Sequence, residues 1–168
     1  MGDWRLVCVA DSTVWISLKY GKLIEAALSL PFQWLVPDVI LEEELQDPSG
    51  AWLENRGVGR CELSGSQVET VIQMATRYRR PSRRDLFALV QAKEERAVLL
   101  TDDRPLREAA SAEGVKVHGT LWLLDQMLAY KVISKPKAAI GLRQMVDAGR
   151  WLPKDEVKRR LRQWEGGG

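Results

Sequence analysis

The sequence predicts an α/β domain in which a parallel β-sheet is covered by helices on both faces. Short, continuous apolar segments alternate along the chain with longer segments of helical periodicity. The clearest of the apolar segments, residues 5–10 and 97–100, have the length and composition of strands that are buried on both faces. Strands joined through helices pair in parallel, so this alternation indicates a parallel sheet.

The first third of the chain is predicted to begin with the strand at 5–10, which is rich in valine. A helix is predicted over residues 12–30, because Pro31 cannot continue it. A second strand is predicted at 34–36. The next helix begins near Pro37, since proline is favoured in a first helical turn.

The middle of the chain is predicted to start with a loop at 47–50, where the composition is typical of turns. A strand is expected over 58–63. Two helices follow at 67–77 and 82–95, and Pro81 separates them.

After the strand at 97–100, a helix is predicted over 103–113 and a short strand over 115–117. Another helix is expected at 119–129. The final segments, 135–148 and 154–164, have the apolar spacing of amphipathic helices. We therefore divide the chain into one domain over 1–130 and a helical C-terminal extension over 131–165 that packs on it.

The composition fits a single globular domain and excludes some function classes. The chain has 168 residues, of which 45% are apolar and 29% charged, and its net charge is +2. Contacts with a polyanion must therefore come from local basic patches. Cys8, Cys61 and His118 are too few for a structural zinc site, and the cysteines are expected to be reduced thiols.

No segment approaches the ~20 apolar residues that span a bilayer. The first apolar run is too short for a signal peptide, and Asp3 precedes it. We expect a cytoplasmic protein without membrane contacts.

Acidic residues follow several of the apolar segments. They are Asp11, the run Glu42, Glu43 and Glu44, then Asp85, and the pair Asp102 and Asp103. In an open α/β sheet, ligands bind beyond the carboxyl ends of the strands, so acids in these places can converge. Two unit charges ~5 Å apart repel by ~3 kcal/mol at an effective dielectric of ~20. A hard cation such as Mg²⁺ or Mn²⁺ would relieve that repulsion.

Each of these acids also has an explanation that involves no ligand. Asp11 precedes a helix and can be its N-cap, although Ser12 can take that place and leave the carboxylate free. Asp85 ends the capping-box pattern that begins at Ser82. Either acid of the later pair can cap the helix that Pro105 helps to start.

The run of three glutamates leaves a choice open. Consecutive helical positions point about 100° apart, so at least two of the three side chains should face solvent. Glu43 lies one turn after Val39, on a face that can turn inward. These considerations do not separate Glu43 from Glu44.

Taken together, the spacing of these acids resembles the PIN domain, the nuclease fold of VapC-like toxins. The resemblance covers about residues 5–130, which include the last predicted strand of the sheet and the turn that follows it. It is carried by the segments 9–12, 36–45, 82–85, 100–106 and 114–121. One branch of the family commonly has a further helical tail, which suits the predicted helices after residue 130.

The resemblance implies a three-layer α/β/α sandwich with a short parallel sheet. It also implies an acidic metal site formed by Asp11, Glu43, Asp85 and Asp103. The Thr-x-Asp spacing from Thr101 favours Asp103, while the branch with this C-terminal segment often has an acid at the position of Asp102, so both stay candidate ligands. Ser12 and Thr101 would be supporting hydroxyls.

Four carboxylates can hold one or two Mg²⁺ or Mn²⁺ ions, which make water a better nucleophile and neutralise charge developing on a phosphate. We therefore expect a metal-dependent ribonuclease. The resemblance further implies a toxin of a toxin–antitoxin pair, which forms homodimers and whose site an antitoxin protein occludes.

Basic and aromatic residues supply candidate contact surfaces. Arginines are dense just before Asp85, and we take Arg80, Arg83, Arg84 and Arg104 as candidate RNA contacts, with a solvated connection between helices as the alternative. Among the seven tryptophans, Trp15 and Trp122 are expected in the core, whereas Trp52, Trp151 and Trp164 are candidates for a protein interface.

Two other functions are compatible with parts of the pattern. The same fold can serve as a nucleic-acid-binding or scaffold protein without catalysis, although all acid positions are filled. A receiver-like phosphoacceptor domain also has acids after strands. Its acidic pair normally follows the first strand, whereas here Asp11 stands alone and the pair comes late.

Overall fold

Five short segments pair side by side as a parallel sheet in the computed structural model, which describes residues 5–166. The strands are β1 (Leu6–Ala10), β2 (Phe32–Pro37), β3 (Gly59–Cys61), β4 (Val98–Leu100) and β5 (Val117–His118). Their order is β3-β2-β1-β4-β5, and every neighbouring pair is parallel. The predicted α/β class with a parallel sheet is confirmed.

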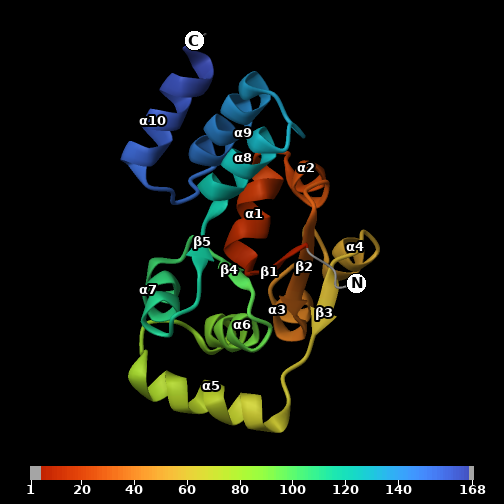
Figure 1. Ribbon diagram of the computed structural model, residues 1–168, viewed down its shortest axis with the longest axis vertical. Helices are drawn as coiled ribbons and strands as arrows, with labels where there is room; N and C mark the ends of the chain where they lie inside the picture. The colour runs from red at the N-terminus through yellow and green to blue at the C-terminus, as the bar shows by residue number, and fades with distance from the viewer. Residues whose placement is uncertain (1–4, 167–168) are drawn as a thin grey trace.

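Helices cover both faces of this sheet (Figure 1). They are α1 (Ser12–Tyr20), α2 (Ile24–Leu28), α3 (Asp38–Glu43), α4 (Gly50–Glu54), α5 (Gly65–Arg77), α6 (Arg83–Glu94), α7 (Arg104–Ala112), α8 (Thr120–Ala129), α9 (Lys135–Asp147) and α10 (Lys154–Glu165). Helix α6 packs against β1, β2 and β4 on one face, with α5 outside it, while α1 packs with α2, α8 and α9 on the other. The arrangement is the predicted three-layer α/β/α sandwich.

The order of the strands creates a switch point between β1 and β4. The chain runs outward from β1 through β2 to β3, and then returns to the other side of β1 to form β4 and β5. Crossover connections on the two sides of such a point leave a crevice at the carboxyl ends of the central strands. Asp11 follows β1, and Asp102 and Asp103 follow β4, so three of the predicted site residues flank this crevice.

Two predicted elements differ from the observed ones for local reasons. The helix expected over 12–30 is split into α1 and α2, because Lys22 adopts a left-handed conformation with φ of 59°. The loop predicted at 47–50 leads directly into α4, which Ser49 caps by accepting a hydrogen bond from the Trp52 N–H at 3.1 Å. A helix of five residues is too short to show helical periodicity in the sequence.

The tryptophans are distributed differently from the prediction in one case. Trp15 is buried, and Trp122 is half-buried and stacks on His118 with a ring separation of 4.3 Å. Trp164, for which the sequence predicts an interface role, is buried instead. It lies seven residues after the buried Val157, so the two side chains share the inner face of α10.

The two helices predicted near the end of the chain are observed as α9 and α10, and α9 packs against α1 and α8. The boundary at residue 130 stays a prediction. Within residues 5–166, every helix is too short or too polar to cross a bilayer.

The contact between α9 and the turn after α1 depends on a glycine. A Cβ atom on Gly141 would lie 2.7 Å from Leu23 Cδ1 and 3.1 Å from the Gly21 carbonyl oxygen. We expect Gly141→Ala to lower the free energy of unfolding by about 1–3 kcal/mol, because the added methyl overpacks the contact. Urea unfolding of the variant measures this.

Gly65→Ala is the matched control, since a Cβ at this helical glycine would meet no atom within 4 Å. Alanine is the better helix former, so the control should be at least as stable as the wild-type protein. If Gly141→Ala is as stable as Gly65→Ala, the close approach of α9 to this turn is refuted.

Candidate metal centre

Asp11 connects β1 to α1 at the switch point of the sheet. Its backbone N–H donates to the Leu100 carbonyl at 3.1 Å, which fixes the residue beside the end of β4. Its Oδ1 accepts from the Thr13 hydroxyl at 2.6 Å and from the Val14 N–H at 3.3 Å. Its Oδ2 accepts from the Thr101 hydroxyl. Asp11, and not Ser12, is therefore the N-cap of α1.

Asp11 is only 1% exposed. Its pKa is raised from 3.8 to about 7, mainly by burial and also by the nearby Asp102 carboxylate, against the lowering effect of the Thr101 and Thr13 hydrogen bonds. An ionised carboxylate in this place is costly unless positive charge compensates for it.

Glu44 is the glutamate that lies beside Asp11. Its Oε2 accepts a 2.5 Å hydrogen bond from the Ser12 hydroxyl, and its side chain is 22% exposed. Glu43 is 52% exposed, and its Oε2 accepts from Arg84 at 2.7 Å. Glu42 points away as well and pairs with Arg60 at 2.6 Å.

The structure therefore favours Glu44 over the predicted Glu43 as the second acid of the site. The sequence places Glu43 one turn after Val39, which is only half-buried. Glu44 is the C-cap of α3, with φ of −108° and ψ of −28°, and its N–H donates to the Ile40 carbonyl at 3.1 Å. Glu44 therefore lies one turn after Ile40, which is buried.

Asp85 occupies the third position of α6 and takes part in a complete capping box. Its Oδ2 accepts from the Ser82 N–H at 2.8 Å, and its own N–H donates to the Ser82 hydroxyl at 3.1 Å. Burial raises the pKa of Asp85, and the carboxylates of Asp103 and Glu44 raise it further. The Asp85 side chain therefore takes part in the cap of α6 and also lies near the other acids.

The two acids after β4 have different surroundings. Asp103 caps α7, with its Oδ2 accepting from the Leu106 N–H at 3.0 Å, and its charge acts on Asp85. Asp102 has both oxygens bound by Thr120: the Thr120 N–H donates to Oδ1 at 2.8 Å and the hydroxyl to Oδ2 at 2.6 Å. This placement favours Asp103 over Asp102 as an acid of the common site.

A family model for the PIN domain matches residues 7–166 of the chain. The chain belongs to the PIN domain family. A comparison with curated proteins gave no match. PIN domains are generally nucleases, so this is a nuclease-type fold. The match includes α9 and α10, and it sets aside the receiver-like alternative.

PIN domains typically use divalent metals, and the donor set of this chain fits Mg²⁺ or Mn²⁺ in kind, since Asp11, Glu44, Asp85 and Asp103 offer hard carboxylate oxygens. Burial and repulsion from neighbouring carboxylates raise the pKa of Asp11 and of Asp85. A nearby cation would stabilise the ionised form of both groups. Between residues 5 and 166, however, no three acidic, histidine or cysteine side chains stand close enough together to hold an ion. Binding would require side chains to rotate.

The arginines predicted to contact RNA lie near the acids, and most of them form ion pairs with glutamates. Arg84 pairs with Glu43 at 2.7 Å, and Arg80 and Arg104 reach Glu108 at 3.9 and 3.1 Å. Arg83 is exposed and has no ion pair in the described part of the chain.

Three site residues escape an analysis of the sequence. Thr13 donates to Asp11 and accepts from the Asp102 N–H at 3.1 Å, so it joins the ends of β1 and β4. Thr120 holds Asp102, and Arg150 donates to the Thr13 carbonyl at 3.2 Å. The only local signal is a threonine two positions after a site aspartate, and it points to Thr13 alone.

Proposed function

We propose that this PIN domain is a metal-dependent endoribonuclease. The observation that supports it most is the arrangement around the switch point, where Asp11 is buried with a pKa of about 7 and Asp85 is influenced by two further acids. The neighbours that raise the pKa of Asp85 are Asp103, the N-cap of α7, and Glu44, the C-cap of α3. A cluster of like charges of this kind is typical of a functional site.

The residues would divide the work as follows. Asp11, Glu44, Asp85 and Asp103 would hold one or two Mg²⁺ or Mn²⁺ ions. Bound ions supply Lewis acidity, which activates water and neutralises charge developing on the phosphate. Thr13 and Thr101 hold the Asp11 carboxylate in place through their hydroxyls. No side chain is needed as a covalent nucleophile.

Exposed arginines beside the acids would bind the RNA backbone. Arg83 is free for a phosphate, and Arg80, Arg84 and Arg104 would exchange their present glutamate partners for phosphates. Such contacts position the strand without reading its sequence.

We further propose that the protein acts as the toxin of a toxin–antitoxin pair and forms homodimers. This step rests on the likeness of the acidic motifs to VapC-like toxins. The presence of a short antitoxin-like reading frame beside the gene, and co-purification of its product with this chain, would test it.

The proposed activity predicts RNA cleavage that depends on a divalent metal. Purified protein incubated with a mixed RNA pool should cleave it with Mn²⁺ or Mg²⁺ and not with EDTA, because the acids alone cannot neutralise charge at the phosphate. Gel analysis of the end-labelled products measures this.

For substitutions of the site acids, such as Asp11→Asn, the matched control is Asp147→Asn, at an exposed aspartate that ends α9. It should cleave like the wild-type protein, which shows that loss of a charge alone is harmless. Absence of metal-dependent cleavage in every pool would refute the nuclease proposal and favour a binding or scaffold protein.

A further inference from the structure

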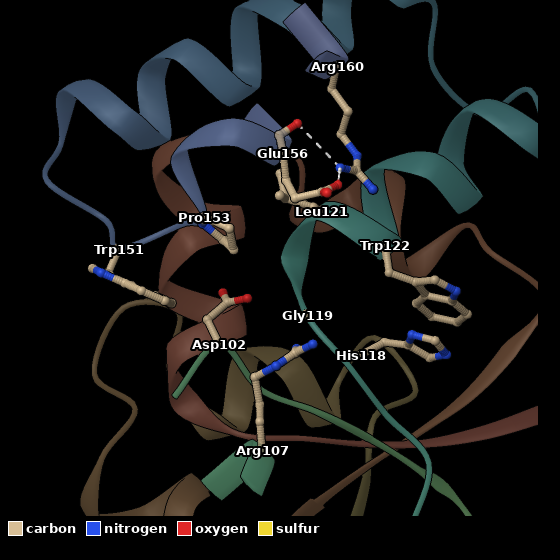
Figure 2. Close-up of a pocket in the computed structure, with 10 residues that line it drawn as sticks. All are labelled: Asp102, Arg107, His118, Gly119, Leu121, Trp122, Trp151, Pro153, Glu156 and Arg160. Atoms are coloured by element: carbon tan, nitrogen blue, oxygen red, sulfur yellow. Dashed lines mark hydrogen bonds and ion pairs between the residues drawn. The ribbon is translucent and has the colours of Figure 1, made fainter. Parts of the chain in front are cut away.

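Trp151 lines two cavities beside the acidic edge. It lies in the segment between α9 and α10 and is 61% exposed. The first cavity has a volume of about 280 Å³ and the second of about 390 Å³, and Asp102 also lines both. Figure 2 shows the indole projecting at the border of the first cavity, away from Trp122 and His118.

The backbone around Trp151 is held on both sides. Arg150 donates from Nε to the Ser17 hydroxyl at 3.1 Å and from Nη2 to the Thr13 carbonyl at 3.2 Å. Leu152 is buried. The segment is therefore fixed to α1, and the exposed indole between two anchored residues is a pre-organised flat apolar surface.

The charges that face the first cavity are mutually compensated. Arg107 lies beside Asp102 and donates to the Thr101 carbonyl at 3.0 Å. Arg160 pairs with Glu156 and with Asp125, each at 2.7 Å (Figure 2 shows the former pair). Because no excess of positive charge results, this cavity suits a neutral group better than a phosphate.

The polar groups of the cavity can still form directed hydrogen bonds. Burial lowers the pKa of His118, so its imidazole is neutral in neutral solution and offers one donor and one acceptor. Arg107 points toward the same space in Figure 2. The volume of about 280 Å³ lies just below the ~300–1,000 Å³ range of drug-sized ligand sites, which suits a small flat ring system.

The second cavity leads from Trp151 to the acids. It is lined by Asp103 and Arg104 from the start of α7 and by Thr13 from α1. A strand that places one base on the indole would therefore run past Arg104 toward the carboxylates.

We propose that Trp151 is a base-stacking platform of a nucleotide subsite, where one nucleobase of a single-stranded RNA stacks on the indole and faces Arg107 and His118. This proposal rests on RNA being the substrate of the PIN domain, but it is tested by binding rather than by cleavage. Aromatic side chains commonly stack on unpaired bases in this way.

Direct binding of a short fluorescent single-stranded RNA, followed by anisotropy in EDTA, tests the proposal. Trp151→Ala should weaken binding about 5- to 150-fold, the equivalent of about 1–3 kcal/mol at 1.4 kcal/mol per factor of ten. Trp151→Phe should stay near the wild type, because it keeps a ring. Tyr20→Ala removes a comparably exposed aromatic from the C-terminal end of α1 and should have no effect.

A set of the same RNA with single abasic positions locates the contact. At one position the loss of the base should weaken wild-type binding and have no further effect on Trp151→Ala, as expected when both changes remove one interaction. Equal affinity of Trp151→Ala and wild type would overturn the proposal, as would failure of the wild type to bind or an equal loss at every position. A protein interface would be the next assignment for Trp151.

Failure of the nuclease proposal has a different signature. In that case cleavage is absent with Mn²⁺ and Mg²⁺, while the effect of Trp151 on RNA binding persists.

Discussion

Asp11→Asn is expected to abolish RNA cleavage. In the metal-free protein, the difference in unfolding free energy between the variant and the wild type should also favour the variant more at pH 8 than at pH 4. Loss of a residue that orients a metal ligand typically costs 10–100-fold, so loss of a ligand should cost more than about 100-fold. The effect on stability follows from the burial of this carboxyl group, which is 1% exposed.

The direction of the pH dependence follows from the raised pKa of Asp11. The folded protein keeps a proton up to a pKa of about 7, whereas the ordinary value is 3.8. Between these values the unfolded chain loses a proton that the folded chain retains, so the free energy of unfolding of the wild type falls as the pH rises. About three pKa units correspond to about 4 kcal/mol.

Asparagine cannot ionise, so the variant escapes this loss. The difference in unfolding free energy between variant and wild type should therefore increase by up to about 4 kcal/mol between pH 4 and pH 8, in urea titrations with EDTA. A constant difference across this pH range for Asp11→Asn would contradict the account of its burial.

Glu44→Gln is expected to reduce RNA cleavage by more than about 100-fold, whereas Glu43→Gln should reduce it less than about 10-fold. Glu44 receives the Ser12 hydrogen bond beside Asp11, and Glu43 is the exposed partner of Arg84. The two substitutions are chemically identical and adjacent, so each controls for the other. Cleavage rates at saturating Mn²⁺ measure the difference.

The reverse order of effects would restore Glu43 as the second acid. Equal and small effects of both substitutions would remove α3 from the catalytic site. Circular dichroism of both variants separates a local effect from unfolding.

Much of the fold follows from local patterns. The central strands β1 and β4 are continuous apolar runs, and helix starts are marked by caps such as Ser82 and by Pro105. Asp11 and Asp103 could be placed near each other because Asp11 directly follows β1, Asp103 comes three residues after the end of β4, and the two strands lie side by side. Asp85 could be placed by its fixed position in a capping box.

Other parts of the site depend on contacts that local patterns do not contain. The case for Glu44 depends on its hydrogen bond to the Ser12 hydroxyl, which is 32 residues away in the sequence. The link from Arg150 to Ser17 joins residues 133 positions apart, and it places Trp151 beside the acids. Such contacts are set by tertiary packing, which overrides local preferences.

Capping and metal binding are not alternatives in this chain. Asp11, Asp85 and Asp103 all take part in helix caps. At Asp85 and Asp103 the cap engages the carboxylate only in part, because a single oxygen accepts a backbone N–H. The caps hold these residues at the carboxyl end of the sheet, from which their side chains would have to rotate to close around an ion.

The most direct test of the central claim, that the carboxyl end of the sheet is a divalent-metal site, is a calorimetric titration of Mn²⁺ into metal-free protein at pH 8. We predict saturable binding to the wild type, accompanied by a rise in its unfolding temperature, and loss of both in Asp11→Asn. Equal Mn²⁺ binding by the wild type and Asp11→Asn would contradict the claim.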